Sequence, residues 1–483
     1  MKENTFYITT TLPYVNAQPH LGHAMEFLRA DVLARFETDR KKQVFFNTGT
    51  DEHGQKIYQK AQAEQMSVQS YCDQQAENFK KLKPQLNLSF NSFIRTTDEH
   101  HVKAAQEFWK RCEQNGSIYK KNYKQKYCVG CELEKTDSEL IDGKCPEHHN
   151  QALEIREEEN YFFKFSAWQE KLLLFYEKNP DFVAPQKRFK EIKNFVAQGL
   201  ADFSISRLKE KMPWGVDVPG DPQHVMYVWF DALINYISCL GWPQDLEKFS
   251  KFWPGVQICG KDNLRQQTAM WQAMLMAADL PNSQKVFVNG HIGVNGQKMS
   301  KSLGNVIAPK EMVTRYGLDA TRYLLLAMGN FGEDFDISWE KMDIKYTADL
   351  ANGLGNLLSR TTNMIEKYFK GKLPASLEKP EDWKKINTEF VTAMENMESS
   401  KALTIIWALI GECNEYIEKN KPWDLAKTNQ AQLVIVLQRL LSSLKFCTLK
   451  LAPFMPATAQ KMTEALDGDI IYKIEPLFPR LEK

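Results

Sequence analysis

The stretch FYITTTLPYVNAQPHLGHAMEFLRADVLARFETDR, residues 6–40, joins a strand, a loop and a helix without interruption. Residues 6–12 are rich in β-branched and aromatic side chains, which favour a strand, and prolines then break it. From His20 to about Arg40, apolar residues recur every three or four positions, which is the period of an amphipathic helix. The chain is therefore expected to open as a β–loop–α unit.

The same alternation continues and then returns late in the chain. A strand at 44–49 leads into a long helix that begins near Gln55. The later elements are strands at 256–260 and 285–292, a helix between them that extends through Met276, and a helix at 319–328. Such alternation predicts a parallel sheet that holds its ligands beyond the C-terminal ends of the strands.

The region between these two stretches has a different composition, because cysteines, histidines and acidic runs replace the alternation. We interpret it as an insertion between two halves of one nucleotide-binding fold. After about Tyr346 the pattern favours helices alone, at 350–368, 383–396, 402–419 and 430–451. The predicted fold is α/β: a Rossmann-like parallel-sheet catalytic domain, split by a zinc-knuckle insertion and followed by an all-α helical bundle. The predicted parts are 1–114 (first catalytic half), 115–225 (insertion), 226–305 (second catalytic half), 306–345 (linking region) and 346–483 (helical domain).

Composition limits the possible classes of protein. The 483 residues are too many for one compact core, and 43% hydrophobic with 25% charged residues is ordinary for a globular protein. No apolar run approaches the roughly 18–20 residues that cross a bilayer, and no basic leader suggests export. The net charge of +1 means that a nucleic acid would need a local basic surface. Scattered cysteines favour reduced, buried thiols in a cytosol, namely Cys72, Cys112, Cys239, Cys259, Cys413 and Cys447.

The segment from Pro19 to His23 places two histidines at the start of the first helix. A helix N-terminus offers free N–H groups and a positive dipole end, so phosphates bind there. Gly22 leaves room for a nucleotide to approach the backbone, and His20 and His23 share one face. They would stabilise charge at an α-phosphate as positioned donors. By itself the motif is as typical of two solvated histidines at a helix start as of a phosphate site.

A second element is the loop GQKMSKSLGN, residues 296–305. Lys298 and Lys301 on such a loop can follow the β- and γ-phosphates as pyrophosphate leaves, with Ser300 between them. A loop of this kind alone is usually a solvated turn. Joined to the two histidines after the first strand, it resembles the signature pair of the class I aminoacyl-tRNA synthetases. That resemblance implies an ATP site made of His20, Gly22, His23, Lys298, Ser300 and Lys301, with the imidazoles and lysines catalytic.

A third element lies in the insertion. Cys128-x-x-Cys131 followed by Cys145-x-x-His148 provides four ligands in two knuckles, which is a tetrahedral Zn²⁺ pattern. His149 could replace His148, but the two-residue spacing favours His148. Three free thiols beside a histidine are the alternative. Because no coordination position remains open for water, the zinc is predicted to be structural. One knuckle pair inside the insertion resembles the methionyl-tRNA synthetases in particular.

Further stretches resemble the methionine site of that family. The match at residues 11–16 implies that Leu12 and Tyr14 contact the methionine substrate. The match at residues 48–54 implies that Asp51 pairs with the ammonium group of that substrate. Asp51 could instead cap a helix. Four residues of the stretch 228–236 fall on one helical face that would suit a thioether, although such a stripe is more often core: Trp229, Ala232, Leu233 and Tyr236. The chain departs from many relatives at two further pocket positions, Asn263 and Gln267, which puts pocket shape and selectivity there in doubt.

The helical domain carries a resemblance too. Residues 352–360 are similar to the family helix that reads the anticodon, which implicates Asn356 and Arg360 on one helix face. Trp423, after Pro422, resembles the family's stacking tryptophan, and single-stranded bases stack on such rings. The alternative for Trp423 is a core residue at a helix start.

The resemblance implies a methionine–tRNA ligase. It would activate L-methionine with ATP to methionyl-adenylate plus pyrophosphate, and then transfer the methionyl group to the 3′-terminal ribose of its tRNA. One structural Zn²⁺, Mg²⁺ with the ATP, a cytoplasmic location, no membrane and a monomer are expected, the last because the chain stops near the end of the helical domain. The alternatives are synthetases for cysteine, leucine, isoleucine or valine, and a zinc-dependent RNA-binding protein with an inactive catalytic fold.

Overall fold

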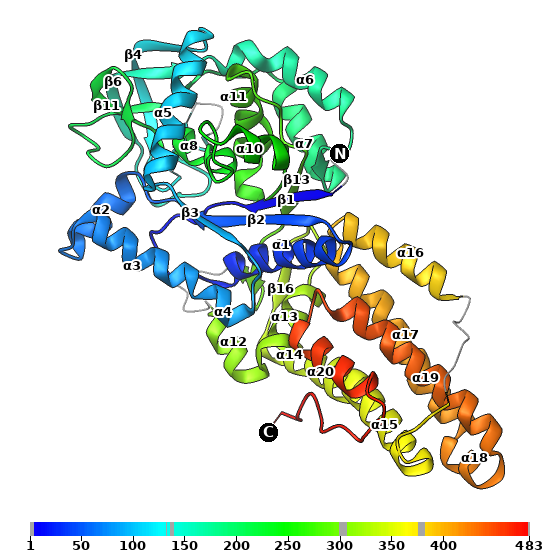
Figure 1. Ribbon diagram of the computed structural model, residues 1–483. Helices are drawn as coiled ribbons and strands as arrows, with labels where there is room; N and C mark the ends of the chain where they lie inside the picture. Colours follow the sequence, from blue (N-terminus) through cyan, green and yellow to red (C-terminus); the bar gives the residue numbers. More distant parts are fainter. Residues whose placement is uncertain (1–3, 132, 136–139, 299–306, 375–381, 482–483) are drawn as a thin grey trace. The chain divides into compact units, whose positions relative to one another are not determined.

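The structure is a computed structural model, and it describes residues 4–131, 133–135, 140–298, 307–374 and 382–481 (Figure 1). The chain forms two compact units, each built from segments that are distant in the sequence. The sheet unit comprises Met1–Gln18, Asn47–Lys80 and Asn91–Val288. The helical unit comprises Pro19–Phe46, Lys81–Phe90 and Asn289–Lys483.

The sheet unit is built on a six-stranded sheet with the order β3-β2-β1-β12-β13-β7. The strands are β1 (Thr5–Thr10), β2 (Gln43–Thr50), β3 (Ser92–Arg95), β7 (Val183–Ala184), β12 (Val256–Gly260) and β13 (Lys285–Asn289). The pairs β2–β3, β1–β12 and β13–β7 are parallel. The strand order therefore reverses between β1 and β12. A parallel sheet has a crevice at such a switch point, beyond the carboxyl ends of its strands.

The helices of the sheet unit follow the predicted alternation with two exceptions. They are α2 (Gln55–Ala63), α3 (Val68–Lys80), α5 (Glu99–Gln114), α6 (Gln169–Lys178), α7 (Gln186–Ala197), α8 (Val228–Ala232), α9 (Asn235–Ser238), α10 (Leu246–Phe252) and α11 (Trp271–Ala277). The long helix expected from Gln55 ends at Ala63, because Gln65 takes a positive φ of 55° that a helix cannot continue through. The second exception precedes α11, where a short 3₁₀ turn, Lys261–Asn263, and a π turn, Gln266–Met270, replace regular helix.

The predicted insertion forms small antiparallel sheets. One has the order β5-β4-β6-β8 and another the order β10-β11-β9. Their strands are β4 (Ile118–Cys128), β5 (Leu133–Lys135), β6 (Glu154–Phe163), β8 (Phe203–Ser204), β9 (Ser206–Leu208), β10 (Asp217–Val218) and β11 (Asp221–Met226). β4 and β6 form a long ribbon, paired from Ile118↔Phe163 to Tyr127↔Glu154. The insertion also supplies β7, the edge strand of the central sheet, which the sequence analysis did not foresee.

The helical unit contains the first helix of the chain and the C-terminal helices. Its helices are α1 (Leu21–Asp39), α4 (Leu82–Leu86), α12 (Pro309–Tyr316), α13 (Leu318–Ala327), α14 (Trp339–Lys345), α15 (Asn356–Phe369), α16 (Asp382–Glu395), α17 (Ser399–Asn420), α18 (Pro422–Thr428), α19 (Gln430–Leu451) and α20 (Pro456–Leu466), with a π-helical stretch at Tyr346–Gly355. A small sheet orders β15 (Gln297–Lys298), β14 (Ile292–Val294) and β16 (Phe335–Ile337). Among the described residues no strand follows β16, as predicted.

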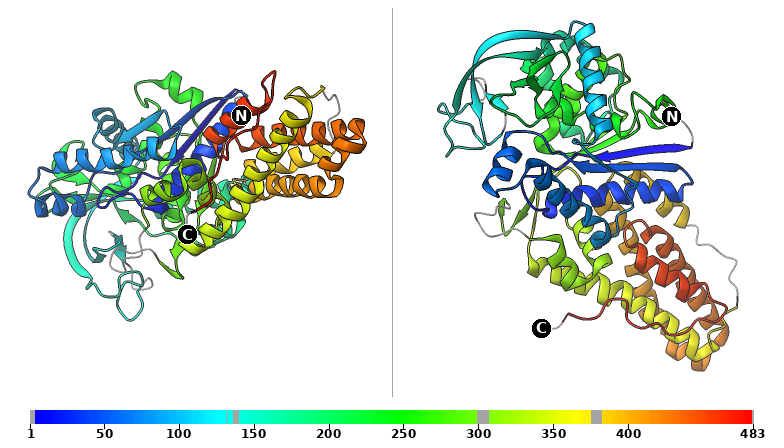
Figure 2. Two further views of the ribbon diagram at one scale, coloured as in Figure 1. Left: turned by 90° about the horizontal axis from the view of Figure 1, so that it is seen from below. Right: turned by 60° about the vertical axis from the view of Figure 1, so that its left-hand side comes forward.

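The C-terminal helices pack as a bundle in which α17 and α19 run side by side (Figure 2). In the described part of the chain α19 is the one helix long and apolar enough to cross a membrane, with 22 residues and a mean hydropathy of 1.3. Its apolar face, which includes Leu433, Leu437 and Leu444, is fully buried, and it contacts α15, α17, α18 and α20. That packing is typical of a core helix in a globular protein.

A buried ion pair ties four segments of the helical unit together. Arg322 on α13 is fully buried, and its Nη2 lies 2.7 Å from Oδ2 of Asp31 on α1. The same guanidinium donates to the carbonyl oxygens of Leu86 (2.8 Å) and Phe454 (2.7 Å). The other Asp31 oxygen accepts from the backbone N–H (2.5 Å) and the hydroxyl (2.6 Å) of Ser89. These partners compensate both buried charges, and they fix α1 against α13, α4 and the turn before α20.

Replacing Arg322 with leucine should lower the free energy of unfolding by about 3–5 kcal/mol, because the buried carbonyl oxygens of Leu86 and Phe454 would lose their donor and Asp31 would keep only Arg35 (2.8 Å) as a cation. The matched control is Arg315→Leu, which removes a pair with Asp343 on a half-exposed side chain and should cost about 1 kcal/mol or less. Denaturant unfolding followed by circular dichroism measures both. Equal effects of the two variants would contradict the structural role given to Arg322.

Candidate active site and metal centre

The two histidines of the first motif occupy the first turn of α1. His20 is the N-cap residue, and its imidazole stacks on that of His23 with 3.9 Å between ring centroids. A Cβ added to Gly22 would lie 2.8 Å from Cε1 of His20. Glycine is therefore required here because a side chain would displace the first imidazole.

Backbone hydrogen bonds determine which nitrogen of each neutral ring carries the proton. The N–H of Gly22 donates to Nδ1 of His20 (3.0 Å), and the N–H of His20 donates to Nδ1 of His23 (3.3 Å). Because Nδ1 acts as the acceptor in both rings, each neutral imidazole carries its hydrogen on Nε2. In this tautomer each ring presents its Nε2–H as a donor, and the binding of a phosphate by these donors stays a prediction.

The pKa of His23 lies well below its ordinary value of 6.5, first because burial disfavours the charged ring and second because His20 lies against it. The ring is therefore neutral at physiological pH. A neutral donor at a helix N-terminus can bind a phosphate oxygen without first having to lose or gain a proton.

The lysine loop begins in the helical unit at a β-hairpin. Gly293 of β14 pairs with Lys298 of β15, and the N–H of Gly296 donates to Oδ1 of Asp336 (2.6 Å). Ser300 and Lys301 lie outside the described residues. The catalytic roles of Lys298 and Lys301 stay predictions.

In the sheet unit, several predicted methionine contacts follow the carboxyl ends of neighbouring strands. Leu12 follows β1, Asp51 follows β2, and Asn263 follows β12. A parallel bridge joins Tyr14 to Asp51, with backbone bonds from Val15 N–H to the Asp51 oxygen (3.1 Å) and from Asp51 N–H to the Pro13 oxygen (2.9 Å). The structure thus brings the first two segments together at the crevice of the sheet.

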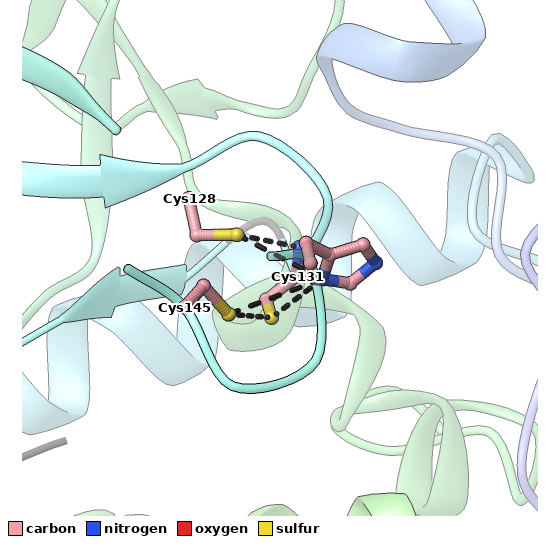
Figure 3. A group of neighbouring side chains, drawn as sticks. Cys128, Cys131 and Cys145 are labelled. Carbon is pink, nitrogen blue, oxygen red and sulfur yellow. Dashed lines mark hydrogen bonds between the residues drawn. The ribbon is translucent and has the colours of Figure 1, made fainter. Parts of the chain in front are cut away.

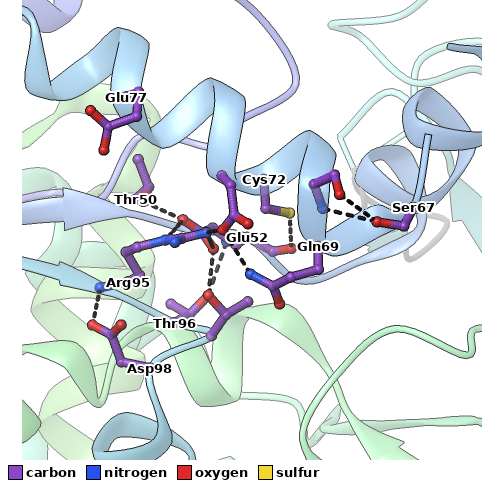
Figure 4. A network of polar contacts seen from close by, with 12 residues as sticks. Thr50, Glu52, Ser67, Gln69, Cys72, Glu77, Arg95, Thr96 and Asp98 are labelled. Carbon is purple, nitrogen blue, oxygen red and sulfur yellow. Dashed lines mark hydrogen bonds and ion pairs between the residues drawn. The ribbon is translucent and has the colours of Figure 1, made fainter.

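Asp51 does not cap α2, because Gly54 is the N-cap residue and no side chain caps this helix. The next residue, Glu52, is firmly held: its buried carboxylate accepts from Nε (2.7 Å) and Nη2 (2.8 Å) of Arg95 on β3 (Figure 4). The hydroxyl of Thr50 donates to the same carboxylate (2.6 Å), and the N–H of Glu52 donates to the Thr96 hydroxyl (2.9 Å). Sequence reasoning missed Glu52 and Arg95, although Glu52 stands inside the quoted motif.

His53, two residues after Asp51, is paired with a carboxylate on α8. Its Nδ1 lies 2.7 Å from Oδ2 of Asp231 on α8, and both side chains are buried. Burial raises the pKa of Asp231, while the imidazole lowers it. Because Asp231 lies between Trp229 and Ala232 in sequence, this pair joins the segment predicted to bind the ammonium to the helix predicted to bind the thioether. Both residues lie within motifs quoted above, but neither was singled out.

The predicted side-chain pocket gathers around Tyr236. Ala232, Leu233 and Tyr236 are buried, and Trp229 is half-buried with an indole N–H that meets no acceptor among the described residues. The amide nitrogen of Gln267 donates to the Tyr236 hydroxyl. One N–H of Gln267 is therefore used on a neighbouring side chain, and its buried carbonyl oxygen meets no donor among the described residues.

The four predicted metal ligands converge at the tip of the β4–β6 ribbon (Figure 3). The ligand atoms of Cys128, Cys131, Cys145 and His148 all lie within 4.8 Å of one another. Zn–S bonds of about 2.3 Å imply separations of roughly 3.8 Å between sulfurs in a tetrahedron. The observed 3.3 Å between Sγ of Cys131 and Cys145, and 3.8 Å from Sγ of Cys128 to Nδ1 of His148, fit such a site.

The knuckle also explains the glycine in its first turn. A Cβ on Gly130 would lie 2.3 Å from the His148 ring. The Gly130 oxygen accepts from Nζ of Lys56 on α2 (2.7 Å), which fastens the knuckle to that helix. His149 is exposed and is not part of the cluster in the described residues. His148 is the ligand that the geometry supports.

The helical unit brings two of the predicted anticodon residues together. The guanidinium carbon of Arg360 lies 5.9 Å from the ring centroid of Trp423, and Nη1 pairs with Oε1 of Glu418 (2.7 Å). Asn356, one turn earlier on α15, is exposed. Trp423 is 36% exposed, so it is not a core residue at the start of α18.

Four features together define a class I aminoacyl-tRNA synthetase. They are a parallel sheet with a switch point, a helix that starts with two imidazoles, a cysteine–histidine cluster in an insertion, and a C-terminal helical domain. The family model described as tRNA synthetases class I (M) matches residues 6–154 and 149–362. The model described as the anticodon binding domain of methionyl tRNA ligase matches residues 375–473. The chain belongs to the methionyl-tRNA synthetase family.

Curated relatives and solved structures agree with this assignment. A methionine–tRNA ligase of Caldanaerobacter subterraneus is 42% identical over 99% of this chain and 79% of the relative. One from Rickettsia bellii is 41% identical over 96% of this chain and 92% of the relative. The structure of Mycobacterium tuberculosis methionyl-tRNA synthetase in complex with methionyl-adenylate matches with a TM-score of 0.93 and 35% identity, covering 99% of this chain and 100% of the other.

Substituting His23 with alanine should lower kcat/KM for methionine-dependent exchange of pyrophosphate into ATP by about 100- to 1,000-fold, the effect of losing one positioned donor. Glutamine, whose amide nitrogen can replace Nε2–H, should recover much of that loss. The exposed His100→Ala is the control and should leave the rate unchanged. Because the pKa of His23 lies below 6.5, its protonation should lower the rate only at more acidic pH. Equal losses for the alanine and glutamine variants would refute the donor role.

Elemental analysis of the purified chain should find one zinc per molecule. His148→Ala should lower zinc affinity by more than the roughly 10- to 100-fold typical of changes outside the ligand shell, because it removes a ligand. The adjacent His149→Ala is the matched control and should retain zinc. Loss of metal from the His149 variant alone would show that the ligand assignment is wrong.

Proposed function

We propose that this protein is a methionine–tRNA ligase whose methionine site lies at the crevice of the sheet unit. The observation that carries the proposal is the placement of the predicted methionine contacts at the carboxyl ends of β1, β2 and β12, together with the family membership. Asp51 meets the substrate ammonium there, and the thioether lies against Trp229 and Tyr236.

In the first reaction, a carboxylate oxygen of methionine attacks the α-phosphorus of ATP. A bond forms between that oxygen and phosphorus as the bond to the β-phosphate oxygen breaks, which releases pyrophosphate. His20 and His23 donate from Nε2 to the phosphate oxygens, Lys298 and Lys301 neutralise the leaving pyrophosphate, and Mg²⁺ accompanies the ATP. A terminal ribose hydroxyl of the tRNA then takes the methionyl group, and AMP leaves.

The helical unit binds the anticodon through Asn356, Arg360 and Trp423, the exposed ring of Trp423 providing a surface on which a base can stack. The cysteine–histidine cluster holds one structural Zn²⁺. None of the nine cysteines forms a disulfide, which supports a reducing cytoplasm. The protein is proposed to act as a monomer.

The test measures amino-acid-dependent exchange between pyrophosphate and ATP with each of the twenty amino acids, followed by charging of tRNA. Methionine should support exchange, and cysteine, leucine, isoleucine and valine should not. Trp423→Ala should leave exchange unchanged while weakening charging about 5- to 100-fold, the contribution of one stacked base. Exchange with another amino acid, or none at all, would sink the proposal.

A further inference from the structure

A second buried arginine of the helical unit, Arg29, lies on α1 six residues after His23. Its side chain is 2% exposed, and among the residues that the structure describes no carboxylate forms an ion pair with it. Burial lowers the pKa of Arg29 to about 10, and the charge of Glu26 raises it in part. The guanidinium is therefore charged at physiological pH, and a buried cation is costly unless its donors are used.

The donors of Arg29 reach two segments that lead into the small sheet of the helical unit. Nη1 donates to Oδ1 of Asn289 (2.6 Å), and Nη2 donates to the carbonyl oxygen of Gly329 (3.4 Å). The guanidinium carbon also lies 5.5 Å from the ring centroid of Phe331. Asn289 comes shortly before β14, and the turn at 329–331 comes shortly before β16. One side chain of α1 thus holds the approaches to two paired strands.

The small sheet connects these approaches to the start of the predicted lysine loop. β14 pairs in parallel with β16 and forms a hairpin with β15, which ends at Lys298. The carboxylate of Asp336 on β16 accepts from the N–H of Gly296 in the turn of that hairpin (2.6 Å), and the carboxylate of Asp334 accepts from the N–H of His291 (2.8 Å). Because these bonds join the strands to one another, a shift at the base of the sheet also shifts the start of the lysine loop.

The helix α1 carries both the two imidazoles and the guanidinium. At a rise of about 1.5 Å per residue, the six residues from His23 to Arg29 span about 9 Å of helix. The contact between Arg29 and Asn289 therefore sets the separation between the histidines and the base of the hairpin. Buried charges can often be replaced by apolar side chains without loss of stability, whereas the planar fork of a guanidinium fixes two acceptors in one geometry.

We propose that Arg29 is a positioning residue for adenylate formation, because it fixes the β14–β15 hairpin against the helix that carries His20 and His23. This inference rests on the proposed function, in which the histidines act at the α-phosphate and the lysines at the leaving pyrophosphate. Arg29 takes no part in the bond changes. Its contribution is confined to the step in which pyrophosphate leaves, since transfer of the methionyl group to tRNA involves no pyrophosphate.

The experiment separates the two half-reactions with Arg29→Met, which removes the charge and the fork. Single-turnover formation of methionyl-adenylate should slow about 10- to 100-fold, the effect of displacing a catalytic group by a small distance. Consumption of preformed adenylate by pyrophosphate should slow by the same factor. Transfer from that adenylate to tRNA, and KM for methionine, should stay within about twofold of the unchanged chain. The adenylate is preformed by long incubation with pyrophosphatase, which is removed before the measurement.

A double-mutant cycle tests whether Arg29 acts through Asn289. Asn289→Leu removes the acceptor and should slow adenylate formation to a similar extent. The double variant should be no slower than the slower single variant, because both changes remove the same contact. The stability control is Leu440→Ala on α19, a fully buried side chain in the bundle. It should lower the free energy of unfolding and leave both half-reactions unchanged at temperatures where the chain is folded.

Any one of three results overturns the inference: an unchanged rate of adenylate formation in Arg29→Met, equal slowing of formation and transfer, or additive effects in the double variant. If Arg29→Met does not fold, Arg29→Lys decides, because an ammonium keeps the charge but lacks the fork. Slower formation with unchanged transfer then supports the positioning role, and any other result overturns it. Absence of exchange in the unchanged chain contradicts the proposed function instead.

Discussion

The buried pair between Asp31 and Arg322 is the interaction on which the geometry of the first helix depends. Two charges with no exposure to water are tolerable only when every donor and acceptor is used, and here carbonyl oxygens, a backbone N–H and a hydroxyl complete the set. The pair fixes the rotation of α1 about its axis. That rotation in turn decides which way the first turn presents His20 and His23, so a structural ion pair determines the direction of the two imidazoles predicted to be donors.

The same principle operates in the sheet unit around Asp51. A carboxylate that is to receive an ammonium must be held before the ligand arrives, because ordering it during binding would cost affinity. Asp51 is held by main-chain bonds to the segment after β1, by Glu52 through Arg95, and by His53 through Asp231. The segment that carries Asp51 is therefore ordered before a ligand arrives, so less of the binding free energy is spent on ordering it.

The sequence predicted those features that depend on local pattern. The helix at 430–451 has its predicted bounds, α1 starts after His20, and the four predicted knuckle residues come together, because each of these features depends on residues close in sequence. The helix expected from Gln55 was too long, since one left-handed residue at Gln65 ends the regular backbone. The pairs Glu52–Arg95 and His53–Asp231 join residues that are far apart in the sequence. Contacts of this kind leave no periodic pattern of apolar and polar residues, so the sequence could not predict them. Strand β7 was missed for the same reason, because two residues become a strand only through their partner β13.

The stacked imidazoles also constrain how the charge of the reaction is handled. With ring centroids 3.9 Å apart, two protonated rings would repel strongly at the start of a helix whose dipole already opposes positive charge. The backbone bonds to both Nδ1 atoms oppose protonation further, since a protonated ring has no acceptor to offer. These histidines can orient and polarise a phosphate, but they cannot neutralise the charge of a departing pyrophosphate. Lysine is the side chain suited to that task, because its ammonium stays charged and moves on a long flexible stem. The reaction as proposed therefore draws on both predicted signatures, with the histidines as donors at the α-phosphate and the lysines as cations at the leaving group, and these roles stay predictions.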